Sequence, residues 1–145
     1  MDNKDFSPFS FIASRITHFD FDNSIFIFEE KNFKKSFGIK FNIRNLSTGD
    51  GKRFGEVVLQ IRIELDDQQP DPNNKKAVIN MTIEGGFSAP EDMPAEQFEN
   101  MLKINGTAAL YSLARGYIIS VTSQSFVRGQ VILPLANFMP KDKND

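Results

Sequence analysis

The chain contains no cysteine and no tryptophan, and its only histidine is His18. The absence of cysteine excludes structural disulfides and thiol chemistry. A zinc site would have to consist mainly of carboxylates, because cysteine and histidine are the usual ligands of this metal. The sequence therefore predicts no metal site and no cofactor.

Long apolar runs and a strong excess of one charge are also missing. No stretch is long and apolar enough to cross a membrane, so we expect no membrane insertion. The N-terminal MDNKDFSPFS lacks the basic and then apolar pattern of a signal peptide, which predicts a cytoplasmic protein. The net charge of -2 carries no signature of polyanion binding for the chain as a whole. We expect one domain over residues 1–145, with flexible ends at 1–8 and 139–145.

Phenylalanine, in contrast, is abundant, with 15 copies among 145 residues. Aromatic side chains bury large apolar areas, so a phenylalanine-rich core is the ordinary explanation. Alternatively, some of these side chains form an exposed apolar surface that binds a partner. Composition favours the core for any single phenylalanine and leaves the second alternative open.

Three segments alternate between apolar and polar residues with the period of a β-strand. They are SFGIKFNIRNL (36–46), EVVLQIRIEL (56–65) and AVINMTIEGGF (77–87), separated by the turn STGDGKRFG and the polar loop DDQQPDPNNKK. Over residues 9–22 the apolar phase is mixed, which a bulge near Ser14 to Thr17 or a strand buried on both faces would explain. The sequence thus predicts four antiparallel strands with one apolar face.

The pattern becomes helical after the last strand. Pro94 is followed by Ala, Glu and Gln, which is typical of a helix start, and Asn105 or Gly106 is expected to break or redirect the helix. The segment LYSLARGYIISVTSQSF (110–126) is predicted to continue it to about Gln124. Its β-branched residues also suit a strand, but its length favours a helix.

This second helical stretch is unusually apolar, because Arg115 is its only charged residue. A helix that is apolar on more than one side needs more than one partner surface. We expect one side to lie on the sheet and the other to meet a second subunit. The sequence therefore predicts a homo-oligomer with this helix at the interface.

Clusters that would support catalysis are weak. His18, Asp20 and Asp22 share strand parity, but no further ligand or base is visibly arranged beside them, so we interpret them as a solvated strand edge. No Gly-x-Ser-x-Gly motif occurs, and neither glycine-containing turn precedes a helix as in a phosphate loop. We predict that the protein is not an enzyme.

Two further segments are candidates for binding. Between Lys31 and Arg53 the chain has seven basic residues with phenylalanines among them, a pattern that would suit single-stranded nucleic acid. Because alternation places Phe and Lys on opposite faces from Gly38 on, we favour a solvated strand face and predict no nucleic-acid partner. In SIFIFEEKNF (24–33), four consecutive apolar residues lie in a connector, which is either a loop folded over the core or an apolar platform for other chains.

The order of these motifs resembles that of the SecB-type protein-export chaperones. LYSLAR (110–115) is similar to the family's Leu-Phe-Pro-Tyr-Ala-Arg helix motif, and LPLANF (133–138) is similar to its Leu-Pro-Pro-x-Asn-Phe. RIT (15–17) resembles the Arg-Ile-Tyr near the end of its first strand, and EGGF (84–87) lies where its fourth strand ends. Phe28 and Phe33 fall where its crossover loop carries a Phe and a Trp. The motif order spans about residues 10–138.

The resemblance implies an α+β fold, with a four-stranded antiparallel Greek-key sheet and a long C-terminal helix packed on one face. It also implies an ATP-independent chaperone, or holdase, that binds non-native polypeptides in apolar grooves and hands them to the SecA motor. The implied assembly is a dimer or a dimer of dimers, that is, a homotetramer. The client-binding residues would be Ile25, Phe26, Phe28 and Phe33, and the interface residues Leu110, Leu113, Tyr117 and Ile119.

The sequence departs from the family pattern in three places. Ser112 and Leu113 stand where the helix motif has Pro and Tyr, and only MPKDKND follows LPLANF, so we expect the family's second C-terminal helix to be absent. The outward residues Lys40, Arg44 and Arg62 make the sheet face mixed to basic, whereas the family docks the motor partly through an acidic face. An alternative is therefore an adaptor oligomer of the same fold that binds one specific partner, such as a labile antitoxin.

Overall fold

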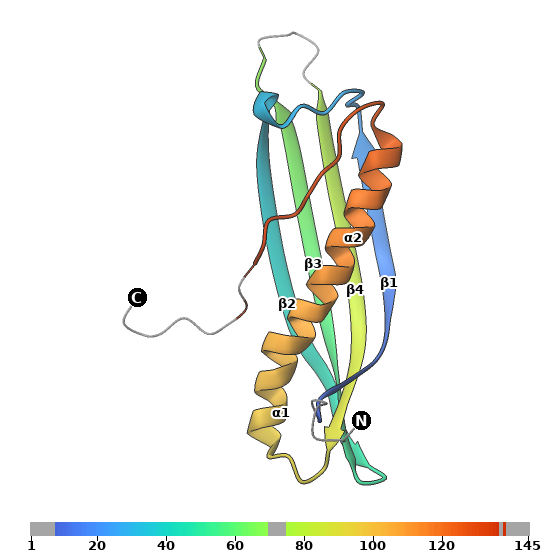
Figure 1. The fold of residues 1–145 in the computed structure, drawn as a ribbon, viewed down its shortest axis with the longest axis vertical. Coiled ribbons are helices and arrows are strands. Elements are labelled where there is room, and N and C mark those ends of the chain that lie inside the picture. Colours follow the sequence, from blue (N-terminus) through green and yellow to red (C-terminus); the bar gives the residue numbers. More distant parts are fainter. Residues whose placement is uncertain (1–7, 70–74, 137, 139–145) are drawn as a thin grey trace, which may run out of the picture.

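The computed structural model describes residues 8–69, 75–136 and 138. Within these residues the chain forms strands β1 (Ser10–Asn23), β2 (Phe33–Gly49), β3 (Lys52–Asp67) and β4 (Lys76–Pro90), helix α1 (Ala95–Met101), a π-helical turn (Leu102–Gly106) and helix α2 (Thr107–Ser125) (Figure 1). A short 3-10 turn (Glu30–Asn32) lies between β1 and β2. Apart from Pro8, the ends for which flexibility was predicted, 1–8 and 139–145, lie outside the described residues.

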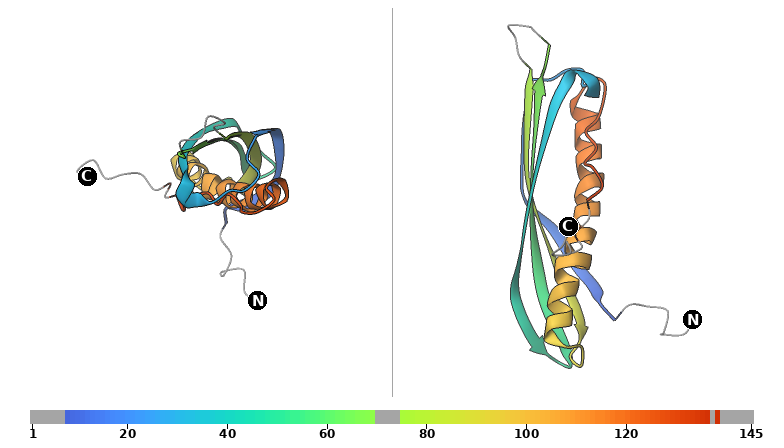
Figure 2. Two further views of the ribbon diagram at one scale, coloured as in Figure 1. Left: turned by 90° about the horizontal axis from the view of Figure 1, so that it is seen from above. Right: turned by 90° about the vertical axis from the view of Figure 1, so that its left-hand side faces the viewer.

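The four strands form one antiparallel sheet in the order β1-β4-β3-β2. The chain crosses from β1 at one edge to β2 at the other through residues 24–32, which we call the crossover loop. Three sequential neighbours plus one strand brought in by a long connection are the Greek-key arrangement, as predicted. Figure 2 shows two layers, with the helices on one face of the sheet and no described element covering the other.

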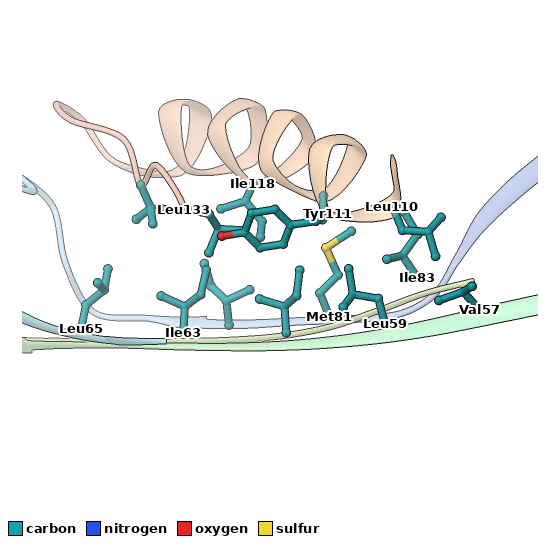
Figure 3. Packing of buried hydrophobic residues seen from close by; sticks show 14 of the residues in the cluster. Val57, Leu59, Ile63, Leu65, Met81, Ile83, Leu110, Tyr111, Ile118 and Leu133 are labelled. Carbon is teal, nitrogen blue, oxygen red and sulfur yellow. The ribbon is translucent and has the colours of Figure 1, made fainter. Parts of the chain in front are cut away.

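The core lies between the sheet and the helices. Alternate residues of β3 and β4 point to this side, as their period of two predicted. Figure 3 shows these side chains facing those of α2 across the layer boundary. Among the core side chains that are at most 3 % exposed are Val57, Leu59, Ile61, Ile63, Leu65, Ile79, Met81, Ile83, Leu110 and Ile118.

Strand β1 shifts its register twice against β4, between Phe11 and Ala13 and between Ile16 and His18. The second shift coincides with the bulge expected near Ser14 to Thr17, so the bulge interpretation is confirmed. The alternative of a strand buried on both faces is wrong, because the first half of β1 is exposed. Each bulge inserts an extra residue and changes which side chains face the core.

The helical region begins at Ala95, directly after Pro94, as predicted. At the position of the expected break, the chain instead makes a π-helical turn and continues to Ser125. The helix approaches the sheet closely at the end of this turn and just after it: a Cβ at Gly106 would lie 3.0 Å from Val57, and a Cβ at Gly85 would lie 2.6 Å from Leu110. Of the helices in the described residues, none has the length and apolarity needed to cross a membrane.

Candidate functional site

After α2 the chain turns back and runs as an extended segment on the helix side of the sheet (Figure 1). We call residues 126–136 the return segment. Its first part pairs with the crossover loop: Val127 N–H donates to Phe26 O at 2.7 Å, and Phe28 N–H donates to Arg128 O at 2.9 Å. Ile27 and Arg128 form a parallel bridge. Two segments about a hundred residues apart in sequence are thus joined through their backbones.

Further along, the return segment is held by side chains of α2. Its Val131 and Leu133 are fully buried, and Leu133 lies between α2 and the sheet in Figure 3. Arg115 Nε donates to Leu133 O at 2.9 Å, and Val131 N–H donates to Thr122 Oγ1 at 2.9 Å. The Tyr111 hydroxyl donates to the carbonyl oxygen of Pro134. Burial raises the pKa of Tyr111, against a smaller opposite effect of the Arg115 charge, so the phenol keeps the proton that it donates.

The crossover loop divides the four predicted client-binding residues between core and surface. Ile25 is 3 % exposed and Phe28 is 7 % exposed, and Phe28 stacks on Phe126 with ring centroids 5.5 Å apart. Phe33 is half-buried, and its ring centroid lies 5.1 Å from that of Phe28. Phe26, in contrast, is 67 % exposed. Ile25 and Phe28 therefore anchor the loop to the core and offer almost no surface to a client, contrary to the prediction. The loop therefore covers the core with Ile25 and Phe28 and exposes the apolar side chains of Phe26 and Ile27.

The two paired segments carry five large exposed apolar side chains, of which the sequence had pointed only to those in the crossover loop. The return strip, as we call it, consists of Phe26, Ile27, Val127, Ile132 and Leu135, which are between 48 % and 86 % exposed. The Lys75 ammonium lies 5.5 Å from the centroid of the Phe26 ring. The sequence signal for the C-terminal half was the apolar run VILPL (131–135), in which only Val131 and Leu133 are buried.

A second exposed apolar surface lies on the side of α2 that adjoins β1. It consists of Leu113 and Tyr117 from α2 and of Phe11, Ile12 and Ile16 from β1, and we call it the β1–α2 face. Tyr117 packs against Phe19 of β1 with ring centroids 5.1 Å apart, which ties the helix to this edge of the sheet.

The four predicted interface residues are likewise divided between the surface and the core. Leu113 and Tyr117 are exposed, and Ile119 is half-buried. Leu110 is fully buried and lies in the close contact with Gly85, so it belongs to the core of the monomer and has no surface for a second copy. The prediction was wrong for Leu110, because a helix that is apolar all round does not show which side faces its own sheet.

The outer face of the sheet carries paired charges. Arg44 contacts Glu56 at 2.8 Å and Glu84 at 2.7 Å, and Arg15 contacts Glu84 at 3.1 Å. These carboxylates raise the pKa of Arg44, while hydrogen bonds from Arg44 and then from Asn45 lower the pKa of Glu56. This face is mixed in charge, as the sequence predicted.

The lowered pKa of Glu56 predicts a loss of stability in acid. A carboxyl with a folded-state pKa below its unfolded value stabilises the fold above the unfolded pKa, near 4.5, and loses this contribution as the pH falls through the folded value. Between pH 6 and pH 3, Glu56→Gln should therefore lose less stability than the wild type in urea unfolding. Solvent screening keeps the effect small, since both partners are 39 % exposed. Equal losses for the two proteins, with Glu91→Gln as the exposed control, would contradict the prediction.

The other candidate clusters of the sequence are dispersed. His18, Asp20 and Asp22 are exposed on β1, and among the described residues no group of three or more His, Asp or Glu is placed to hold a metal. In the basic segment, Lys35 pairs with Glu30 and Arg44 takes part in the outer-face network. The structure thus brings together two apolar surfaces and no constellation of reactive groups in the part of the chain that it describes.

Known proteins resemble the chain in structure. No protein-family model matches it, and no curated protein matches its sequence. The Mycobacterium tuberculosis SecB-like chaperone Rv1957, solved in complex with a ChAD peptide from the Rv1956 HigA1 antitoxin, superposes with a TM-score of 0.68 over 92% of this chain and 93% of that chain, at 10% identity. A Streptococcus agalactiae protein of unknown function gives a TM-score of 0.49 at 18% identity, over 88% of this chain and 97% of that chain. Because the superposition on the first of these covers almost the whole of both chains, this chain has the SecB-like α+β fold, with four antiparallel strands and a long helix on one face.

Proposed function

We propose that this protein is an ATP-independent chaperone that binds non-native polypeptides along the return strip, in the cytoplasm. The observation that carries the proposal is the strip itself, because large apolar side chains gathered on an otherwise well-packed domain indicate an interaction surface. The SecB-like fold supports a polypeptide ligand, since the M. tuberculosis chaperone with this fold was solved with a bound peptide. The same relationship favours a binding protein over an enzyme, and the proposed activity needs no cofactor.

The chemistry of the strip suits unfolded chains. An unfolded polypeptide exposes apolar side chains, and burying them against the strip contributes roughly 25 cal/mol per Å2 of apolar surface removed from water. Contacts to Phe26 and to aliphatic side chains such as Ile132 and Leu135 are largely non-directional, so many client sequences satisfy them. Binding to the strip itself requires no movement of the core, because the strip is exposed in the folded monomer.

We further propose that the chain assembles through the β1–α2 face into a dimer or a dimer of dimers. Leu113 and Tyr117 lie on the side of α2 that adjoins β1, and the return strip is built on the crossover loop and the return segment. Assembly through the first surface leaves the second free for clients. Several return strips in one oligomer would bind one client chain with added avidity.

Delivery to SecA is the route that the family resemblance implies, and the mixed charge of the outer face gives it little support. A dedicated client is the second candidate function, favoured by the antitoxin peptide on the M. tuberculosis structure. An adaptor of this kind would capture one stoichiometric partner from a lysate and show no affinity for unrelated unfolded chains. A general holdase would bind both.

Suppression of aggregation tests the proposed site. We expect the wild-type protein to suppress light scattering by a chemically unfolded, aggregation-prone protein when equimolar tetramer is present. Phe26→Ser combined with Val127→Ser should weaken the apparent affinity about tenfold, because two exposed apolar contacts are lost. The control is Leu46→Ser, a substitution of a 47 % exposed leucine outside the strip. Absence of suppression by the wild type would refute the holdase proposal, and equal activity of all variants would move the site elsewhere.

A further inference from the structure

The return segment lies as an extended strand beside α2, on the helix side of the sheet (Figure 1). Two of its apolar side chains, those of Val131 and Leu133, enter the core from alternate positions, while Ile132 between them stays 51 % exposed. This is the period of two of an extended chain with one side buried. We call the place that these two side chains occupy the strand site.

The hydrogen bonds of the strand site are made to the backbone of the segment and to none of its side chains. Arg115 and Tyr111 donate to the carbonyl oxygens of two consecutive residues, and Thr122 accepts the N–H of Val131. Any L-polypeptide in the same extended conformation presents these groups at the same spacing. The site therefore selects for extended backbone with large apolar side chains two positions apart.

The segment is also attached in a way that allows its replacement. It follows all strands and helices of the described chain, and its ladder with the crossover loop consists of two backbone hydrogen bonds, at Phe26 and Phe28. The hydrogen bonds that join the four strands and those within α1 and α2 do not involve it. Its release would break none of the hydrogen bonds that join the strands or that hold α1 and α2.

We propose that the strand site is a polypeptide-binding site in which the return segment is the resident occupant. A client segment that is extended and has two large apolar residues separated by one position displaces the resident and takes over the bonds to Tyr111, Arg115 and Thr122. This inference rests on the proposed function and names the class of client segment that it would accept. Because the resident competes from within the same chain, only a client strand that is freely available, as in a non-native protein, gains the site.

A labelled copy of the resident is the direct probe. We would synthesise FVRGQVILPLANF, the sequence of residues 126–138, with a fluorescent label and measure its binding to the full-length protein by anisotropy. In full-length Leu133→Ser the resident loses its buried anchor, and this protein should bind the peptide about tenfold more tightly than the wild type does. Val57→Ser is the matched control, since Val57 is equally buried but lies against Gly106, away from the strand site.

Two peptide variants test the pattern of side chains. The peptide with Leu133→Ser should fail to bind, and the peptide with Ile132→Ser should bind like the parent, because only the first substitution affects an inward residue. Equal binding of both peptides, or equal binding of the parent peptide to wild type, Leu133→Ser and Val57→Ser, would overturn the proposal. If Leu133→Ser does not unfold cooperatively, the milder Leu133→Ala replaces it in the same comparison.

Competition by a client separates this inference from the proposed function. An excess of a chemically unfolded protein should release the labelled peptide from Leu133→Ser. If the wild type suppresses aggregation but the unfolded protein releases no peptide, the strand-site proposal fails and the holdase function stands. If the peptide binds as expected but no aggregation is suppressed, the strand site stands and the holdase function fails.

Discussion

Gly129→Ala is expected to destabilise the folded protein by about 2–4 kcal/mol, the range for a strained backbone combined with a buried clash. Gly129 has φ of +100°, a conformation that residues with a side chain rarely adopt. A Cβ there would lie 2.2 Å from the carbonyl oxygen of Phe28, which is part of the backbone and cannot turn away. The return segment would have to separate from the crossover loop, and the burial of Phe126 and Leu133 would be weakened with it. Urea unfolding measures the loss.

Gly38→Ala is the control for this substitution. Gly38 lies within β2 without positive φ, and a Cβ there would meet only Arg62 Cβ at an ordinary 3.9 Å. Since glycine within a strand costs about 0.5–1 kcal/mol relative to alanine, this variant should be as stable as the wild type or more stable. A Gly129→Ala protein that unfolds at the wild-type urea concentration would show that the return segment does not contribute to the stability of the fold.

The second large effect concerns assembly. We expect the wild type to sediment at micromolar concentration as a dimer or tetramer of the 16.4 kDa chain, and the double variant Leu113→Asp, Tyr117→Asp to sediment as a monomer. Both side chains are exposed in the monomer, so the substitutions spare the buried side of α2 and remove, within the monomer, the contact of Tyr117 with Phe19. In an oligomer they would place unpaired carboxylates in an apolar contact, which is strongly unfavourable. Analytical ultracentrifugation distinguishes the two states.

The choice of residues makes this experiment specific. Ile119→Asp, at a half-buried position, would disturb folding and assembly together, and Leu110→Asp would place a charge in the core. Leu46→Asp, at an exposed position on β2 outside the β1–α2 face, should leave the mass unchanged. A monomeric wild type at micromolar concentration would contradict the proposed assembly.

The strands and the helix of this fold could be predicted from local patterns. Every second residue from Val57 to Leu65 on β3 and from Ala77 to Ile83 on β4 is apolar and buried, so period two determined both the strand and its inward face. The break in parity in the first strand located the bulge before His18 for the same reason. Pro94 marked the helix start because its fixed φ suits the first turn.

The candidate site was harder to predict, because its geometry depends on contacts between distant segments. Four consecutive apolar residues in the crossover loop carry no period, so the sequence could not tell inward Ile25 and Phe28 from outward Phe26. Their orientation depends on Asn23, whose side chain bonds the backbone N–H and carbonyl of Ile25, and on the pairing with Arg128. The return segment was seen only as the motif LPLANF, with no indication that it fills a place beside α2.

The π-helical turn also determines where the length of the helical region can change. From Phe98 to Thr122, every fourth residue is buried, and the turn of five residues from Leu102 to Gly106 lies within this series. A π-turn holds one residue more than an α-turn, so losing a residue there would restore a regular α-helix. The buried side of α2 would still face the sheet, and its exposed side would still face away. The same loss within α2 would rotate all following residues by roughly 100° relative to the sheet and exchange core and surface positions. Among relatives of this chain, single-residue insertions and deletions in the helix should therefore concentrate at residues 102–106.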